Sequence, residues 1–231
     1  EEELKEANSH IDKHPNAWMQ PEGMHDTEGW KSLETSMRFL QRMIEALGTD
    51  FLVFDFKEVN DILLKSANHL NRFVREITYF VIEALFKISE KCDEENQKRF
   101  IELCGDLVPI TAQGLADNWS QVRFTASCAT RAYYNFAKTN KHLRNTYDQL
   151  MLPRMCLNRY YVAEGVRNYS LETWKILVEN KGIDMVLEHA ESFSDQHDPI
   201  GVPCKQYILT RPGCCVYKRQ TEITELCEYK E

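Results

Sequence analysis

The chain of 231 residues contains little glycine and proline, nine and seven residues, and this scarcity argues against a loop-rich fold. Its eight cysteines form no Cys-x-x-Cys pair, and the sequence has neither a Gly-x-Ser-x-Gly segment nor a glycine-rich phosphate loop. The first absence argues against the common zinc and dithiol sites. The other two argue against an activated serine and a nucleotide-binding loop. We therefore expect a protein that is not an enzyme and needs no cofactor.

Long apolar runs and an excess of positive charge are also missing. The longest apolar stretches, such as 51–54, are far too short to span a bilayer, and no signal peptide is visible, so we expect no membrane association. The formal net charge of −8 divides into −5 over residues 1–27, −2 over 28–193 and −1 over 194–231. A near-neutral middle argues against a nucleic-acid partner. These features favour the cytoplasm, with the nucleus as the alternative compartment.

Two sequence markers recur at a nearly constant interval through the middle of the chain. The first is a valine followed by an arginine, at successive spacings of 48 and 44 residues: Val74-Arg75, Val122-Arg123 and Val166-Arg167. Trp30-Lys31 stands 44 residues before the first of these pairs. The second marker ends in proline, at Pro109 and Pro153, each 13 residues before a valine–arginine pair. Two markers that keep one offset predict an internal structural repeat.

Apolar side chains between the markers are spaced by three or four residues, which places them on one face of a helix. The pattern predicts a leading helix and three helix pairs, in which each second helix opens at a valine–arginine marker. The leading helix covers 29–47, and the first helices of the pairs cover 59–70, 95–107 and 143–155. We expect Pro109 and Pro153 to break or kink the first helices. Asn71 and Asn118 are expected to cap second helices.

Helix pairs of this length, with a proline in the first helix and valine–arginine opening the second, resemble the HEAT repeat. The resemblance covers residues 28–193 and implies an all-α fold, an α-solenoid of antiparallel helix pairs with a HEAT or armadillo-like superhelix. In HEAT repeats the arginine usually bonds to an acidic residue in the turns, which forms a ladder along the stack. The resemblance implies that Arg75, Arg123 and Arg167 are ladder residues, with Asp117 as a partner.

The two ends of the chain do not follow the repeat. Residues 1–27 are rich in acidic side chains and are predicted to be a flexible arm. Residues 194–231 contain prolines and cysteines without helical spacing and are predicted to be an irregular tail. Candidate metal ligands gather towards this end, at His189, His197, Cys204, Cys214, Cys215 and Cys227. Their spacing fits no closed zinc pattern, so we expect no metal, and a redox or metal-dependent role of these cysteines is kept as an alternative.

The turns inside the helix pairs combine asparagine with aromatic residues and arginine. They read Asn71-Arg72-Phe73, Asn118-Trp119-Ser120 and Asn158-Arg159-Tyr160-Tyr161. Such turns align along one ridge of a solenoid, and aromatic and arginine side chains are the usual anchors of binding surfaces. We predict a partner-binding ridge made of Arg72, Phe73, Trp119, Arg159 and Tyr160. In the alternative interpretation the aromatic rings fold inward and staple neighbouring helices, while the arginines pair with ladder acids.

The predicted ridge makes a protein–protein interaction scaffold the leading hypothesis. Trp30, at the start of the first long helix, resembles the tryptophan in the first turn of the TOG class of HEAT domains. This similarity implies tubulin as a candidate partner and microtubule binding as an alternative function. An RNA-binding solenoid would need polar pairs that recur at the repeat spacing on the inner helices, and the sequence has none.

Overall fold

The computed structural model describes residues 29–54 and 56–178, and all regular structure in these ranges is helical. The all-α prediction is thereby confirmed for the described part of the chain. Its seven α-helices are α3 (Trp30–Leu47), α4 (Phe56–Ala67), α5 (Arg72–Ser89), α6 (Glu94–Gly114), α7 (Ser120–Phe136), α8 (Lys141–Asn158) and α9 (Glu164–Val178). Two short 3-10 helices, η2 (Gly48–Val53) and η3 (Ala137–Thr139), lie between them. The described residues fall inside the predicted 28–193 domain, whereas the predicted arm and tail lie outside them.

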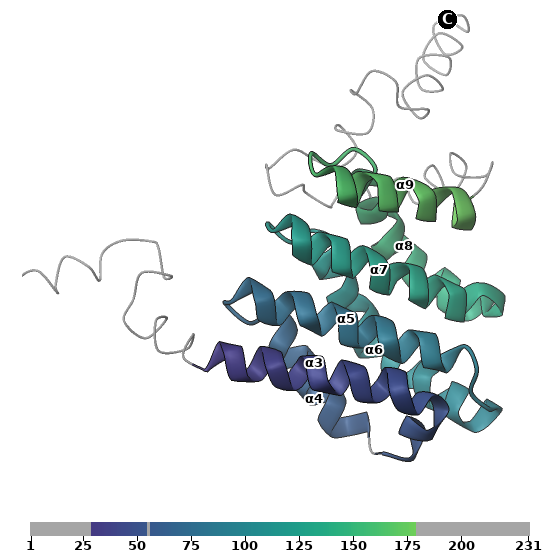
Figure 1. The fold of residues 1–231 in the computed structure, drawn as a ribbon. Helices are drawn as coiled ribbons and strands as arrows, with labels where there is room; N and C mark the ends of the chain where they lie inside the picture. The colour runs from purple at the N-terminus through teal and green to yellow at the C-terminus, as the bar shows by residue number, and fades with distance from the viewer. Residues whose placement is uncertain (1–28, 55, 179–231) are drawn as a thin grey trace, which may run out of the picture.

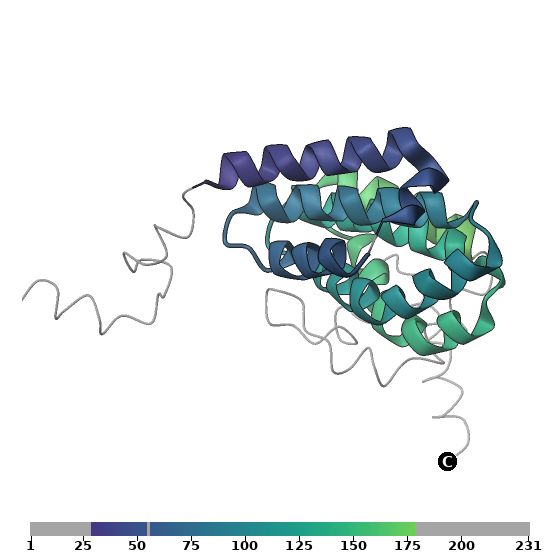
Figure 2. The same ribbon diagram turned by 90° about the horizontal axis from the view of Figure 1, so that it is seen from below.

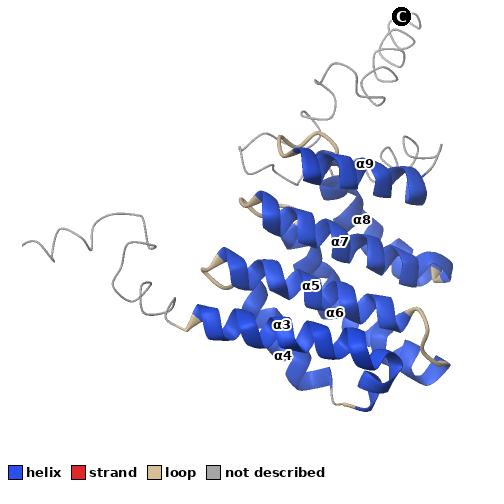
Figure 3. Cartoon of the chain, in the orientation of Figure 1, coloured by secondary structure: helices blue, strands red, loops and turns tan. Residues whose placement is uncertain are grey.

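The seven helices pack in two layers. Helices α3, α5, α7 and α9 lie side by side in one layer, and α4, α6 and α8 form the layer behind it (Figures 1 and 2). The chain alternates between the layers, so that α4–α5, α6–α7 and α8–α9 are neighbouring pairs joined by short turns. These three turns lie along the same side of the molecule (Figure 3). The alternation therefore brings residues from turns far apart in the sequence into one row.

The valines of the repeated marker occupy equivalent positions in the second helices. Val74, Val122 and Val166 are each buried, one near the start of α5, α7 and α9. They occupy the same place in each second helix because the helical face that carries them turns towards the first helix of the pair. Burying a side chain of this size contributes about 1.5–3 kcal/mol to stability. The spacing that predicted the repeat therefore marks buried positions.

Two buried tyrosines join the layers by hydrogen bonds. The Tyr79 hydroxyl in α5 donates to the Ile110 carbonyl in α6 at 3.0 Å, and the Tyr133 hydroxyl in α7 donates to the Leu143 carbonyl in α8 at 3.2 Å. Burial raises the pKa of both hydroxyls and keeps them as donors. The Tyr79 ring also lies so close to Gly114 that a Cβ atom there would collide with it. Gly114 is thus required by close packing at the end of α6.

The two prolines do not end their helices. Pro109 lies inside α6 and Pro153 inside α8, and both helices continue beyond the predicted ends at 107 and 155. A proline removes one N–H group from the helix. Buried side chains on both sides of each proline hold the helix in place, including Leu107 and Ile110 around Pro109. Tertiary packing therefore overrides the local penalty, and the prediction of a helix break was wrong.

The two predicted asparagine caps have different outcomes. The prediction for Asn71 is confirmed, since its side chain accepts a hydrogen bond from the backbone N–H of Phe73 at 2.9 Å. The prediction for Asn118 was wrong. The N-cap of α7 is Trp119, without a side-chain cap, and the Asp117 carboxylate accepts from the backbone N–H of Trp119 at 2.8 Å. Asp117 accepts this hydrogen bond in place of Asn118, and its carboxylate is also held by Arg75, as described below.

None of the described helices combines the length and the apolar character that a membrane crossing requires.

Candidate functional site

The arginines of the repeated marker close the turns in front of their own helices. Each one donates to the backbone carbonyl six residues earlier in the chain. The pairs are Arg75 with His69, Arg123 with Asp117, and Arg167 with Tyr161. A side chain that binds the carbonyls of a turn fixes the path of the chain there. The three turns are therefore stabilised by the same contact, which orders the row of turns as a surface.

One carboxylate also joins two neighbouring turns. The Arg75 guanidinium binds Asp117 through Nε at 2.8 Å and through a second nitrogen at 3.2 Å. The two side chains are only 15% and 13% exposed, so the pair is largely removed from water. Asp117 uses one of its oxygens for the backbone N–H of Trp119 as well. The ion pair thus links α5 to the α6–α7 turn and sets the position of Trp119.

The next marker arginine uses a neutral acceptor in the following pair. Arg123 is buried, and one of its nitrogens donates to Oδ1 of Asn158 at 2.9 Å. The Asn158 amide in turn donates to the Leu115 carbonyl at 2.9 Å, and the Arg123 guanidinium lies 4.2 Å from the centre of the Tyr161 ring. An amide therefore stands where the HEAT resemblance implied an acid. Arg167, at the last described turn, bonds within its own pair.

Four side chains from three helices form a continuous stack beside these turns. The Trp30 and Phe73 rings are stacked, with centres 5.3 Å apart and an interplanar angle of 17°. The Arg72 guanidinium lies 4.7 Å from the centre of the Phe73 ring and 4.3 Å from that of the Trp119 ring. We call Trp30, Phe73, Arg72 and Trp119 the aromatic–arginine column. It runs along the start of α3, α5 and α7, and Phe73 and Trp119 remain 40% and 47% exposed.

The other two predicted ridge residues point elsewhere. The Arg159 guanidinium lies 4.6 Å from the centre of the Trp174 ring, and Trp174 is only 6% exposed. Tyr160 is half-buried and packs against the core. The cause is a shift within the turn: Arg159 directly follows the end of α8, whereas Arg72 is the first residue of α5. The structure therefore brings together three of the five predicted residues.

A hollow of about 240 Å³ lies next to the column, at the starts of α5, α7 and α9. It is lined by Glu76, Ser120, Gln121, Phe124, Ala163, Gly165 and Val166. Burial raises the pKa of the Glu76 carboxyl, while Arg38 and Arg72 act in the opposite direction. The sequence gives no sign of this hollow, because its lining comes from three segments far apart in the chain and carries no motif.

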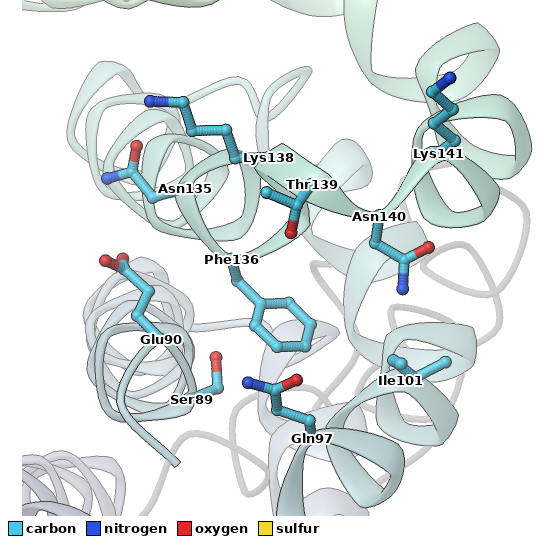
Figure 4. A pocket seen from close by; sticks show the side chains of 10 residues that line it. All are labelled: Ser89, Glu90, Gln97, Ile101, Asn135, Phe136, Lys138, Thr139, Asn140 and Lys141. Atoms are coloured by element: carbon cyan, nitrogen blue, oxygen red, sulfur yellow. The ribbon is translucent and has the colours of Figure 1, made fainter. Parts of the chain in front are cut away.

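A second, larger hollow of about 670 Å³ lies in the part of the molecule formed by the α5–α6 and α7–α8 connections. Figure 4 shows the Phe136 ring in its middle, with Glu90 on one side. The side chains of Lys138 and Lys141 point away from each other. Within the described residues Glu90 forms no ion pair with either lysine. The charged side chains that line this hollow do not point to a common centre, so the hollow is a weaker candidate site than the column.

Three of the four described cysteines, Cys104, Cys128 and Cys156, are buried, and Cys92 is partly buried. Burial raises the pKa of the Cys104 thiol to about 12 and that of the Cys128 thiol to about 11, which leaves both protonated at neutral pH. In ranges 29–54 and 56–178, no three histidine, cysteine or acidic side chains are grouped so that they could hold a metal ion. The alternative based on the cysteines after residue 200 lies outside the described residues.

The aromatic–arginine column is therefore the strongest candidate site in the described part of the chain, and it rests on geometry. The HEAT and TOG resemblances stay predictions. No family model, no curated protein and no solved structure matches the chain.

Proposed function

We propose that the described helices form a short α-solenoid of HEAT-type pairs and that this solenoid is a non-enzymatic scaffold for another protein. Three observations support the solenoid. The chain alternates between two layers, the turns inside the pairs lie on one side, and the three marker arginines make the same contact to a carbonyl six residues earlier. Repeated units that contact mainly their neighbours are typical of solenoids.

The exposure of the aromatic–arginine column carries the proposal of protein binding. Tryptophan and arginine are enriched among the residues that dominate binding energy in interfaces. Phe73 and Trp119 keep 40% and 47% of their surface exposed although both are packed in the column. Their neighbours in the stack already restrict their motion, so less conformational entropy is lost when a partner binds. The column is thus an anchor that is ordered before the partner arrives.

Stapling of neighbouring turns and partner binding are compatible roles. The ring–ring contact of Trp30 with Phe73 joins α3 to α5, and the cation–π contact of Arg72 with Trp119 joins α5 to the N-cap of α7. Contacts of this kind contribute about 0.5–1.5 kcal/mol each. A partner uses the edges that remain exposed, while the stacked faces hold the turns together.

Affinity capture with matched variants tests the scaffold proposal. Wild type, Trp119→Ala and Phe39→Ala are used as bait in cell extract. Phe39 is 66% exposed on α3 and takes no part in the column, so its replacement controls for the loss of any exposed aromatic residue. We expect Trp119→Ala alone to lose proteins that wild type captures. Equal capture by all three baits, or equal loss with Phe39→Ala, would contradict the proposal.

Tubulin is a second, more specific candidate partner, favoured by the position of Trp30. This residue opens α3 and stacks on Phe73, so the tryptophan that resembles the TOG pattern belongs to the column. Co-sedimentation with purified tubulin dimers at micromolar concentration tests this candidate. We expect a complex that Trp30→Ala weakens; the absence of co-migration for wild type would rule tubulin out and leave the general scaffold proposal intact.

A further inference from the structure

The Arg72 guanidinium contacts two aromatic rings and has no hydrogen-bonded acceptor among the described residues. Aromatic rings cover it at 4.7 Å, from Phe73, and at 4.3 Å, from Trp119. Among the described residues no hydrogen bond or ion pair involves its nitrogens. A guanidinium carries five N–H donors, and a cation–π contact does not supply them with an oxygen acceptor. Arg72 therefore presents a positioned set of donors without an acceptor.

Other arginines of the second helices differ in this respect. Arg75 has its two-pronged pair with Asp117, and Arg131 in α7 reaches Glu172 at 2.9 Å and Thr173 at 2.8 Å. These arginines also contact rings or turns, but their donors are occupied by acceptors from the neighbouring pair. Arg72 thus differs from Arg75 and Arg131 because no carboxylate of this chain's described residues forms an ion pair with it.

Nearby acidic side chains do not fill this place. Glu76, one turn further along α5, lines the hollow described above and attracts Arg72 electrostatically, but it forms no ion pair or hydrogen bond with it. Glu34 on α3 is engaged by Arg38. A second cation lies at the far end of the column, where the Lys31 ammonium is 5.7 Å from the centre of the Trp30 ring. The column thus offers two positive groups beside exposed rings.

We propose that the edge of Arg72 binds the carboxylate of a glutamate or aspartate in a short acidic peptide of the partner, with Phe73 and Trp119 contacting the adjacent residues. The planar fork of a guanidinium matches the two oxygens of a carboxylate. The hollow lined by Gln121 and Phe124 receives a neighbouring side chain of the peptide. This inference rests on the proposed function, because it names the chemistry of the partner for the same surface.

A nucleic acid fits the same donors less well. Binding to a phosphate backbone relies on several lysine and arginine contacts, and its strength depends on how many phosphates are neutralised. The column supplies two cations, Lys31 and Arg72, and the chain carries a formal net charge of −8. Two cations neutralise too few phosphates to hold a long phosphate backbone, but they are enough for one or two carboxylates.

The test uses a fluorescein-labelled peptide of about twelve residues that alternates glutamate with alanine and leucine, and the same peptide with glutamine in place of every glutamate. Fluorescence anisotropy with the full chain measures both affinities. We expect the glutamate peptide to bind about tenfold more tightly than the glutamine peptide. In Arg72→Gln this preference should disappear.

Arg42→Gln is the matched control, because it removes the same charge from an exposed position on α3 whose partner is Glu45. We expect it to change the preference less than about twofold. Arg72→Lys keeps the charge but lacks the planar fork, so it should recover only a small part of the preference. Circular dichroism and urea unfolding of each variant establish that it is folded.

Three results would overturn the inference: no preference for the glutamate peptide, an equal loss in Arg42→Gln, or full recovery in Arg72→Lys. Tighter binding of a single-stranded oligonucleotide of similar length would also overturn it, in favour of a phosphate ligand. If the glutamate preference is absent while Trp119→Ala still loses captured proteins, only the carboxylate inference fails. If Trp119→Ala captures the same proteins as wild type as well, the scaffold proposal fails with it.

Discussion

The α4–α5 turn and the α8–α9 turn contain the same kinds of residue and place them differently. In the first, Arg72 and Phe73 stack with Trp119 in an exposed column. In the second, Arg159 lies over the buried Trp174 and Tyr160 packs against the core. The difference comes from where the arginine stands relative to the helix ends. Arg72 is the first residue of α5, and its side chain reaches Trp119 in the neighbouring turn. Arg159 follows the last residue of α8, and its side chain contacts Trp174 in the second helix of the same pair.

This difference separates two uses of an arginine beside an aromatic ring. The contact of Arg159 with the buried Trp174 is part of the packing between α8 and α9, so we expect it to affect stability. The contact with Trp119 leaves both side chains partly exposed, and we propose that it serves binding. Substitutions on the two sides should therefore have different consequences, and the four predictions below test that separation, beginning with the largest expected change in stability.

The ion pair that supports the column should be the most sensitive point. Asp117→Ala removes the carboxylate partner of Arg75 and the acceptor of the Trp119 backbone N–H in a site largely shielded from water, and leaves Arg75 only backbone carbonyls as acceptors. We expect a loss of about 3 kcal/mol in the free energy of unfolding, measured by urea denaturation. Asp106→Ala removes an exposed hydrogen bond to Asn60 and should cost less than about 1 kcal/mol. Similar losses in both variants would contradict the described role of Asp117.

The α6–α7 turn, which carries Trp119 of the column, begins at the end of α6. We expect this end of α6 to have no space for a larger side chain at Gly114. Gly114→Ala places a methyl group against the buried Tyr79 ring, and we expect a loss of about 1–3 kcal/mol. Gly105→Ala in the same helix meets only the Tyr147 hydroxyl at 3.9 Å, an ordinary contact. It should leave stability unchanged or raise it by up to about 1 kcal/mol, because alanine favours the helix. Thermal unfolding of the two variants gives the comparison.

The two arginines should differ in what their removal affects. Arg159→Ala uncovers the buried Trp174 ring and should lower the free energy of unfolding by about 1–2 kcal/mol. Arg72→Ala removes a half-exposed side chain and should cost less than about 1 kcal/mol. Urea denaturation of both variants tests the order. A larger loss for Arg72→Ala would mean that the column serves mainly as a staple.

The smallest expected effect concerns pH and Glu76. Burial raises the pKa of its carboxyl, so the folded protein holds this proton to a higher pH than the unfolded chain does. Stability should therefore fall as the pH rises from the ordinary glutamate pKa, near about 4, through the higher pKa of the folded protein, and stay lower above it. Glu76→Gln removes this penalty. We expect a slightly higher urea midpoint than wild type at pH 7, no difference at pH 3, and no change at pH 7 for the exposed Glu102→Gln.

The periodicity of apolar residues predicted the buried positions and the order of the helices. It did not predict how side chains are oriented in the turns. The valines of the marker are core residues because a helical face repeats, and the helix order follows from the same spacing. The HEAT resemblance named Asp117 as a partner of the ladder arginines, and the structure pairs it with Arg75. The orientation of Arg159 could not be predicted, since a shift of one residue in a turn sends a side chain outward or inward. The end of α6 was predicted too early, before Pro109, because packing outweighs a single missing hydrogen bond.

Hydroxyl-radical footprinting read by mass spectrometry tests most directly whether the column is an exposed, partner-binding surface. In the free protein, we expect Phe73 and Trp119 to be oxidised several times faster than Trp174, which is 6% exposed. On binding a captured partner, Phe73 and Trp119 should be protected, while Phe39 keeps its rate. Equal oxidation of Trp119 and Trp174 in the free protein, or protection of Phe39 in place of the column, would contradict the account.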